Sequence, residues 1–172
     1  MSACMPQFSQ MIAKIQENIG SKFESHPDYL FQDQVYPMML SFFSEVNKKT
    51  IIGTKAKAVT KSWEFCLIEN TPCIGEAELD GYLKLCQDFC AQMVERDDPC
   101  HSFTYVSLIL LTEEFDLSLR KKLKKFHEEI DYRFTDGYGW SSLRIAVVDG
   151  KSQNIYTNHY GADLKKRLTG LF

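Results

Sequence analysis

The sequence lacks both the long apolar run of a membrane helix and the layout of a secretion signal. Its longest apolar stretch, near Val106 to Leu111, has the length of a strand, whereas a membrane helix needs about 18 or more apolar residues. The first residues, Met-Ser-Ala-Cys-Met-Pro-Gln, contain no basic start followed by an apolar segment. We therefore expect a cytoplasmic protein that makes no use of a membrane.

The sequence also lacks a strong charge of either sign. The 172 residues carry a formal net charge of −3 and have an isoelectric point near 5.8. Proteins that bind nucleic acids usually carry a basic excess, so the composition disfavours a nucleic-acid partner. A small molecule or another protein fits this composition better, and the sequence does not decide between a monomer and a homo-oligomer.

Common catalytic motifs are missing as well. The sequence contains no Gly-x-Ser-x-Gly nucleophile turn, no Gly-x-x-x-x-Gly-Lys-Ser/Thr phosphate loop and no Gly-x-Gly-x-x-Gly dinucleotide motif. We therefore predict no cofactor, and the sequence identifies no catalytic residue.

Six cysteines are present, but the chain is large and carries no export signal, so we expect them to be reduced. Cys86, Cys90, Cys100 and His101 form the one group that resembles a zinc-ligand set. Cys86 and Cys90 lie one helical turn apart, whereas the adjacent Cys100 and His101 would point in different directions on a strand. Buried, metal-free cysteines are therefore the favoured interpretation, and we predict no metal site.

Hydrophobic periodicity predicts an alternation of helices and strands along the chain. Helices are expected at residues 7–19, 33–47, 76–95, 117–130 and 162–168. Strands are expected at residues 50–60, 62–69, 103–112, 143–148 and 155–157, the first two as a hairpin, with a loop at 70–73 and turns at 136–142 and 149–154.

This order of elements predicts a single α+β (mixed α/β) domain spanning residues 1–172. A pair of N-terminal helices in residues 1–49 would pack on a sheet-and-helix core in residues 50–172. The core would hold a central mixed sheet of about five to six strands, since strands joined by long helical segments pair within one sheet.

The expected turn at residues 136–142 is the first candidate for a binding site. It contains two glycines, which would allow a close backbone approach, and Tyr138 and Trp140, which could stack on a ring. The alternative interpretation is a tight turn in which Trp140 covers the edge of the core.

A basic helix is the second candidate, because Arg120, Lys121, Lys124 and Lys125 lie close together and could bind phosphate or an acidic partner. The alternative is a solvated helix face, which is the more common role of such a run of charges.

Several segments resemble an uncharacterised bacterial protein family of the clostridia and related Firmicutes. They are His-Ser-Phe-Thr-Tyr-Val-Ser-Leu-Ile-Leu from residue 101, Gly-Trp-Ser-Ser-Leu-Arg-Ile-Ala-Val-Val-Asp from residue 139, and Thr-Asn-His-Tyr-Gly-Ala-Asp-Leu from residue 157. The resemblance covers roughly residues 51–168 and implies a bacterial cytoplasmic protein of unknown function, with no catalytic residues to carry over. It marks Gly139, Trp140, Arg144 and Asn158 for inspection.

We therefore expect a non-catalytic binding or interaction module whose ligand or partner contacts Tyr138, Trp140, Arg144, Asn158 and His159. The alternative is a hydrolase that acts on a phosphorylated or nucleic-acid substrate. That alternative requires acidic side chains or His159 to converge with Lys121 or Lys125 in one cleft.

Overall fold

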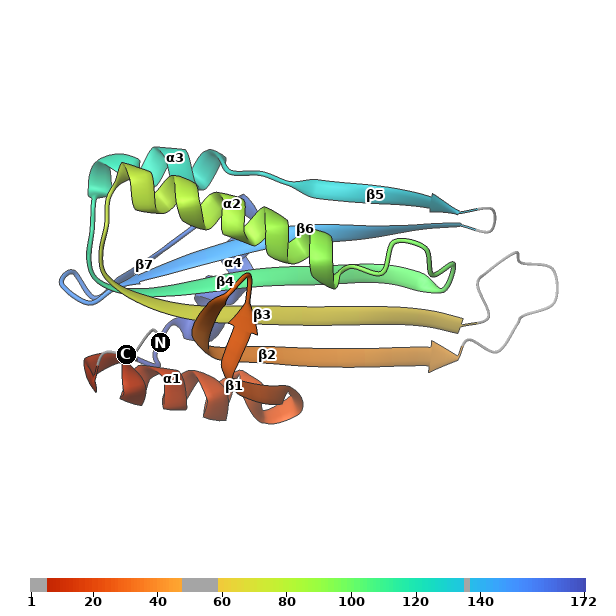
Figure 1. The fold of residues 1–172 in the computed structure, drawn as a ribbon, viewed down its shortest axis with the longest axis horizontal. Coiled ribbons are helices and arrows are strands. Elements are labelled where there is room, and N and C mark those ends of the chain that lie inside the picture. Colours follow the sequence, from red (N-terminus) through yellow and green to blue (C-terminus); the bar gives the residue numbers. More distant parts are fainter. Residues whose placement is uncertain (1–5, 48–58, 135–136) are drawn as a thin grey trace.

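One seven-stranded sheet between two layers of helices makes up the fold (Figure 1). The structure, a computed structural model, describes residues 6–47, 59–134 and 137–172. The sheet has the strand order β1-β2-β3-β4-β6-β5, and β7 also pairs with β6. Its strands are β1 (Glu24–Phe31), β2 (Gln34–Asn47), β3 (Val59–Ile74), β4 (His101–Phe115), β5 (Glu129–Phe134), β6 (Gly137–Asp149) and β7 (Asn154–Thr157). The helices are α1 (Pro6–Asn18), α2 (Glu76–Met93), α3 (Arg120–Lys125) and α4 (Ala162–Leu168), with short 3-10 turns η1 (Gly20–Lys22), η2 (Leu117–Leu119) and η3 (His159–Gly161).

The centre of the sheet consists of β3, β4 and β6, which run parallel to one another. Parallel neighbours need a long crossover, and α2 supplies it between β3 and β4, while η2, α3 and β5 lie between β4 and β6. All other pairings are antiparallel. Strand β4 occupies one edge of β6, so β5 and β7 share the other edge, β5 along its first half and β7 along its second.

Each face of the sheet carries its own apolar core. On one face α2 and α3 bury Leu79, Phe89 and Leu123 against side chains of the central strands such as Leu108 and Ile145. On the other face α1 and α4 pack on the alternate strand positions. That second core contains Phe8, Ile12, Ile15, Ile19, Met38, Leu40, Cys66, Ile68, Ile109, Leu111, Ala146, Val148, Leu164 and Leu168. The central strands are therefore apolar at successive positions where both faces are covered.

The predicted pair of N-terminal helices is wrong, because α1 is the single α-helix in the described part of residues 1–49. Residues 24–47 instead form the antiparallel β1–β2 hairpin. The apolar residues of 35–46 mimic helical spacing because Met38 and Leu40 face one core while Met39 faces the other. Periodicity cannot separate a helix from a strand that is buried on both faces. Pro37 is poorly suited to a helix interior, and it precedes Met38, where pairing with β3 begins.

The predicted hairpin between residues 50–60 and 62–69 is also wrong. Strand β3 runs without a turn from Val59 to Ile74 and includes residues 70–73, which were expected to be a loop. The segment Thr60-Lys61-Ser62 contains no glycine, proline, asparagine or aspartate to favour a tight turn. Most of the expected strand at 50–60 lies outside the described residues.

Strand β5 was missed, which accounts for two further differences. The basic helix ends at Lys125 rather than near residue 130, and β5 starts at Glu129. Its residues 129–132 alternate polar and apolar, which is strand periodicity, although Ile130 also continues the apolar spacing of the preceding helix. Much of the turn expected at residues 136–142 is the start of β6, with residues 135–136 outside the described part.

Most of the other predicted helices and strands are confirmed. Helices α1, α2 and α4, strands β4 and β7, the turn before β7 and the single α+β domain agree with expectation. The sheet has seven strands rather than five or six. In the described part of the chain, no helix is long and apolar enough to span a membrane.

The packing of Phe89 between α2 and the β1–β2 hairpin leads to a stability prediction. Phe89 is 1% exposed, and its ring meets those of Phe31 and Tyr29 at centroid distances of 5.2 and 6.3 Å. We expect Phe89→Ala to lower the free energy of unfolding by about 3–5 kcal/mol, because it leaves a cavity in the core. Denaturant unfolding followed by circular dichroism measures this loss.

The matched control is Leu30→Ala, since Leu30 lies in β1 between the two aromatic residues that Phe89 contacts but is 64% exposed. This variant should change the stability by less than about 1 kcal/mol. Equal losses in both variants would contradict the packing described for Phe89.

Candidate functional site

Three aromatic side chains form a continuous cluster on one face of the sheet. Phe103 and Tyr105 come from β4 and Trp140 comes from β6, and we call the three together the aromatic face. The rings of Phe103 and Trp140 are stacked at 5.3 Å between centroids, and Tyr105 meets Trp140 edge-on at 5.4 Å. All three side chains are half-buried, and they belong to neither apolar core.

Strand register explains why these rings lie together. Phe103 pairs with Trp140 and Tyr105 with Ser142, and partners in adjacent strands point to the same face. They share this face with the core under α1 and α4, but that core contacts the other end of β4 and β6. In Figure 1 the strands extend beyond the region where α1 and α4 lie. The aromatic face therefore occupies the end of the sheet that these helices leave uncovered.

A buried arginine supports the aromatic face. The side chain of Arg144 is 3% exposed, and its Nε donates a hydrogen bond to Ser107 Oγ at 3.0 Å. Its guanidinium also pairs with the Glu64 carboxylate and lies 4.1 Å from the centre of the Tyr105 ring. Glu64 accepts a second ion pair from Arg167 of α4 at 3.2 Å. The network thus joins β3, β4, β6 and α4 directly beside the rings.

Two acidic side chains border the aromatic face on β5. Asp131 pairs with Trp140 and Glu129 with Ser142, so both carboxylates are on the same side of the sheet as the rings, and both are exposed. Partial burial and then the negative charge of Glu129 raise the pKa of the Tyr160 phenol, and the charge of Asp131 adds to the effect. This edge of the aromatic face therefore carries two exposed carboxylates.

Asn158 joins β6 to the end of α3 rather than facing solvent. The backbone N–H of Ile145 donates to its Oδ1 at 2.9 Å, and its Nδ2 donates to the carbonyl oxygens of Leu143 at 2.9 Å and Phe126 at 3.2 Å. These hydrogen bonds use backbone groups of β6 between Ser142, where the pairing with β5 stops, and Ala146, where the pairing with β7 starts. A Cβ atom on Gly161 would come within 2.9 Å of this amide oxygen, so the site depends on that glycine as well.

The other two predicted ligand contacts are His159 and Tyr138. His159 lies in η3, where its ring contacts those of His127 at 5.7 Å and Tyr160 at 5.4 Å. Tyr138 belongs to β6, but its side chain lies outside the described part of the structure. The structure therefore brings Trp140 and Arg144 together through Tyr105, and gives Asn158 a set of backbone partners.

The basic helix α3 lies away from the aromatic face, on the side covered by α2. Lys122 joins it to α2 through Asp80 at 2.6 Å and Glu76 at 3.3 Å, and the Arg120 guanidinium lies 5.8 Å from the Tyr156 ring centre. Lys121, Lys124 and Lys125 are exposed, and among the described residues none of the three forms an ion pair.

The glycine expected to admit a ligand is instead covered by a histidine. A Cβ atom on Gly139 would lie 2.3 Å from His101 Nδ1, so the bare backbone makes room for that ring. His101 is buried, stacks on Trp63 at 5.4 Å and is hydrogen-bonded through Nε2 to Thr104 Oγ1 at 2.8 Å. The described residues contain no group of three or more His, Cys, Asp or Glu side chains suited to a metal ion.

Sequence reasoning missed Phe103, Tyr105, Glu64, Glu129 and Asp131. A usable signal was present in the alternation of Phe103, Tyr105 and Ser107 along one strand and of Trp140, Ser142 and Arg144 along another. Taken alone, each alternation indicates one face of a strand, and only the pairing of β4 with β6 brings the two sets together.

The role of Asn158 leads to a second stability prediction. Asn158→Ala should lower the free energy of unfolding by roughly 2–3 kcal/mol, because buried backbone groups of β6 lose their partners. The control is Asn154→Ala in β7, where the side chain is exposed, and its loss should stay under about 1 kcal/mol. Urea titration of both variants measures the difference, and equal stability of wild type and Asn158→Ala would refute the bridging role.

The cysteines supply a test of reactivity. The five described cysteines are free; burial raises the pKa of Cys66 to about 12 and that of Cys86 well above its usual value, whereas Cys73 is exposed. Because the thiolate is the reactive form, iodoacetamide at pH 8 should label Cys73 at least about tenfold faster than Cys66 or Cys86. Peptide mapping by mass spectrometry measures the rates, and denatured protein, in which the difference should vanish, is the control. Rapid labelling of Cys86 in the folded protein would contradict the burial.

Comparison with known proteins assigns a family but no activity. No curated protein and no solved structure matches the chain. A family model described as a domain of unknown function, DUF8052, matches residues 7–170, which include every described residue of the aromatic face and its supports. The resemblance to a family of unknown function noted in the sequence is thereby confirmed at that level, and the chain belongs to the DUF8052 family.

Proposed function

We propose that this domain is a non-catalytic binding module that receives a cationic, Lys- or Arg-rich segment of another protein on its aromatic face. The observation that carries the proposal is the stacked cluster of Phe103, Tyr105 and Trp140, which lies outside both cores and is only half-buried. Clustered apolar rings at a surface mark interaction sites, and tryptophan and tyrosine are enriched among the residues that dominate binding energy.

The charges around the rings favour a cationic partner. The exposed carboxylates of Glu129 and Asp131 lie on the strand beside Trp140. A lysine or arginine of a partner could stack on the Trp140 ring while pairing with Asp131, and such cation–π contacts contribute about 0.5–2 kcal/mol. The acidic border would also speed the encounter with a basic segment and make it sensitive to salt.

The supporting network favours a rigid site. Ser107 and Glu64 hold Arg144 in place, and its guanidinium lies against the Tyr105 ring. Tyr105 is therefore ordered before a partner binds. A surface that is ordered in advance loses less conformational entropy on binding. In this proposal Arg144 positions the aromatic face and does not itself contact the partner.

The hydrolase alternative has less support. It requires acidic side chains or His159 to meet Lys121 or Lys125, whereas the ring contacts of His159 are with His127 and Tyr160. Among the interactions of the described residues, none joins His159 to either lysine. We further propose that the module acts in the cytoplasm of a clostridia-type bacterium; the five free cysteines agree with a reducing compartment.

The binding proposal can be tested with a defined probe. A short Arg-Gly-Lys repeat peptide should bind the purified protein in isothermal titration calorimetry, and Trp140→Ala should weaken binding by about tenfold through the lost cation–π contact. Asp131→Asn should weaken it less and should flatten its dependence on salt concentration, because one charge of the acidic border is removed.

Trp63→Phe is the matched control, since Trp63 stacks on His101 on the opposite face of the sheet. It should bind the peptide as wild type does, and circular dichroism should confirm that all variants are folded. Equal affinity for a Glu-Gly repeat peptide, or unchanged binding by folded Trp140→Ala, would refute the proposal.

A further inference from the structure

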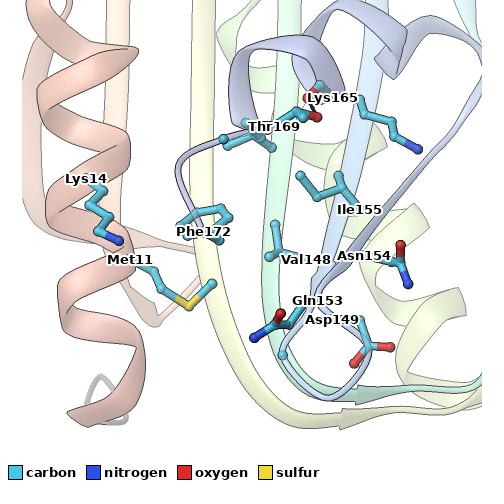
Figure 2. Close-up of a pocket in the computed structure, with 13 residues that line it drawn as sticks. Met11, Lys14, Val148, Asp149, Gln153, Asn154, Ile155, Lys165, Thr169 and Phe172 are labelled. Atoms are coloured by element: carbon cyan, nitrogen blue, oxygen red, sulfur yellow. Dashed lines mark hydrogen bonds between the residues drawn. The ribbon is translucent and has the colours of Figure 1, made fainter.

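A pocket of about 440 Å³ lies at the opposite end of the sheet from the aromatic face (Figure 2). Helix α1 forms one side, the β6–β7 hairpin forms the other, and the segment that follows α4 lies between them. In Figure 2 Met11 and Lys14 extend from α1, and Val148, Gln153 and Ile155 lie across from them, with Phe172 between. A volume of this size is typical of sites for small organic molecules, which run from about 300 to 1,000 Å³.

The lining of this pocket is largely apolar. Val148 and Leu168 belong to the core beneath α1 and α4, Met11 and Ile155 pack against that core, and Phe172 is 44% exposed. Met11, Ile155 and Phe172 keep exposed surface and could cover the apolar body of a ligand, whereas Val148 and Leu168 are 3% and 0% exposed.

Two lysines supply the positive charge. The side chains of Lys14 and Lys165 both line the pocket and are exposed, and within the described part of the chain neither forms an ion pair. The lining contains one acidic residue, Asp149. Its carboxylate already accepts hydrogen bonds from the Lys151 N–H at 3.0 Å and the Ser152 hydroxyl at 2.7 Å. The pocket thus combines an apolar wall with a net positive rim.

We infer that this pocket binds a small organic anion with an apolar body, such as a medium-chain or aromatic carboxylate. The apolar part would lie against Met11, Ile155 and Phe172, and the carboxylate would face either Lys14 or Lys165, which extend on opposite sides of Phe172 in Figure 2. The site is independent of the aromatic face, because the two share no residue and use opposite charges.

Decanoate is a suitable probe, and decanol is its uncharged counterpart. Isothermal titration calorimetry of the full chain, below the concentration at which decanoate forms micelles, should detect binding of decanoate and weaker binding of decanol. Removal of both ammonium groups in the double variant Lys14→Ala/Lys165→Ala should weaken decanoate binding by about two- to fivefold, as expected for one exposed charge pair, and leave decanol binding unchanged.

Lys166→Ala is the matched control, because Lys166 neighbours Lys165 on α4 but pairs with Asp163 and does not line the pocket. It should bind decanoate as wild type does. Met11→Trp should fill the pocket and abolish binding of both probes, with folding checked by circular dichroism. Absence of decanoate binding by wild type, or equal weakening by Lys166→Ala and the double variant, would overturn the inference.

Discussion

The parallel pairing of β3, β4 and β6 is the constraint on which the rest of the structure depends. Parallel neighbours cannot be joined by a tight turn, so long connections must return the chain to the same end of the sheet. Here α2 and α3 are parts of those connections, and both pack on one face. The opposite face is left to α1 and α4, which lie outside the crossovers and cover only the end of the sheet where their own core is located.

This arrangement divides the second face into two regions with different chemistry. Under α1 and α4 the strand positions are aliphatic, and beyond them the same faces of β4 and β6 carry Phe103, Tyr105 and Trp140. Arg144 and Glu64 lie at the border between the regions. Burying a guanidinium is costly unless a carboxylate and hydrogen-bond acceptors receive it, and Glu64, Ser107 and the Tyr105 ring meet that requirement.

Local segments were predicted well, whereas segments that depend on distant partners were not. The amphipathic helices α1 and α2, the short helix α4 and the turn into β7 follow from spacing and turn residues alone. The β1–β2 hairpin was mistaken for a helix because Met38, Met39 and Leu40 are buried on alternate faces. Trp140 and Arg144, two of the predicted ligand contacts, lie on one face of β6, but the sequence could not indicate that Asn158 would complete the hydrogen bonding of β6.

By itself the sequence determined where apolar and polar side chains alternate, and therefore the α+β class and the helices whose apolar stripe is a local pattern. Only the tertiary structure decided which strands are neighbours, and with them the aromatic face, the Arg144 network and the pocket beside α1. The physical reason is that periodicity depends on residues a few positions apart, whereas pairing between β4 and β6 depends on contacts more than thirty positions apart, such as Phe103 with Trp140. A ring, an arginine or a lysine becomes a site only when such pairing places other groups next to it.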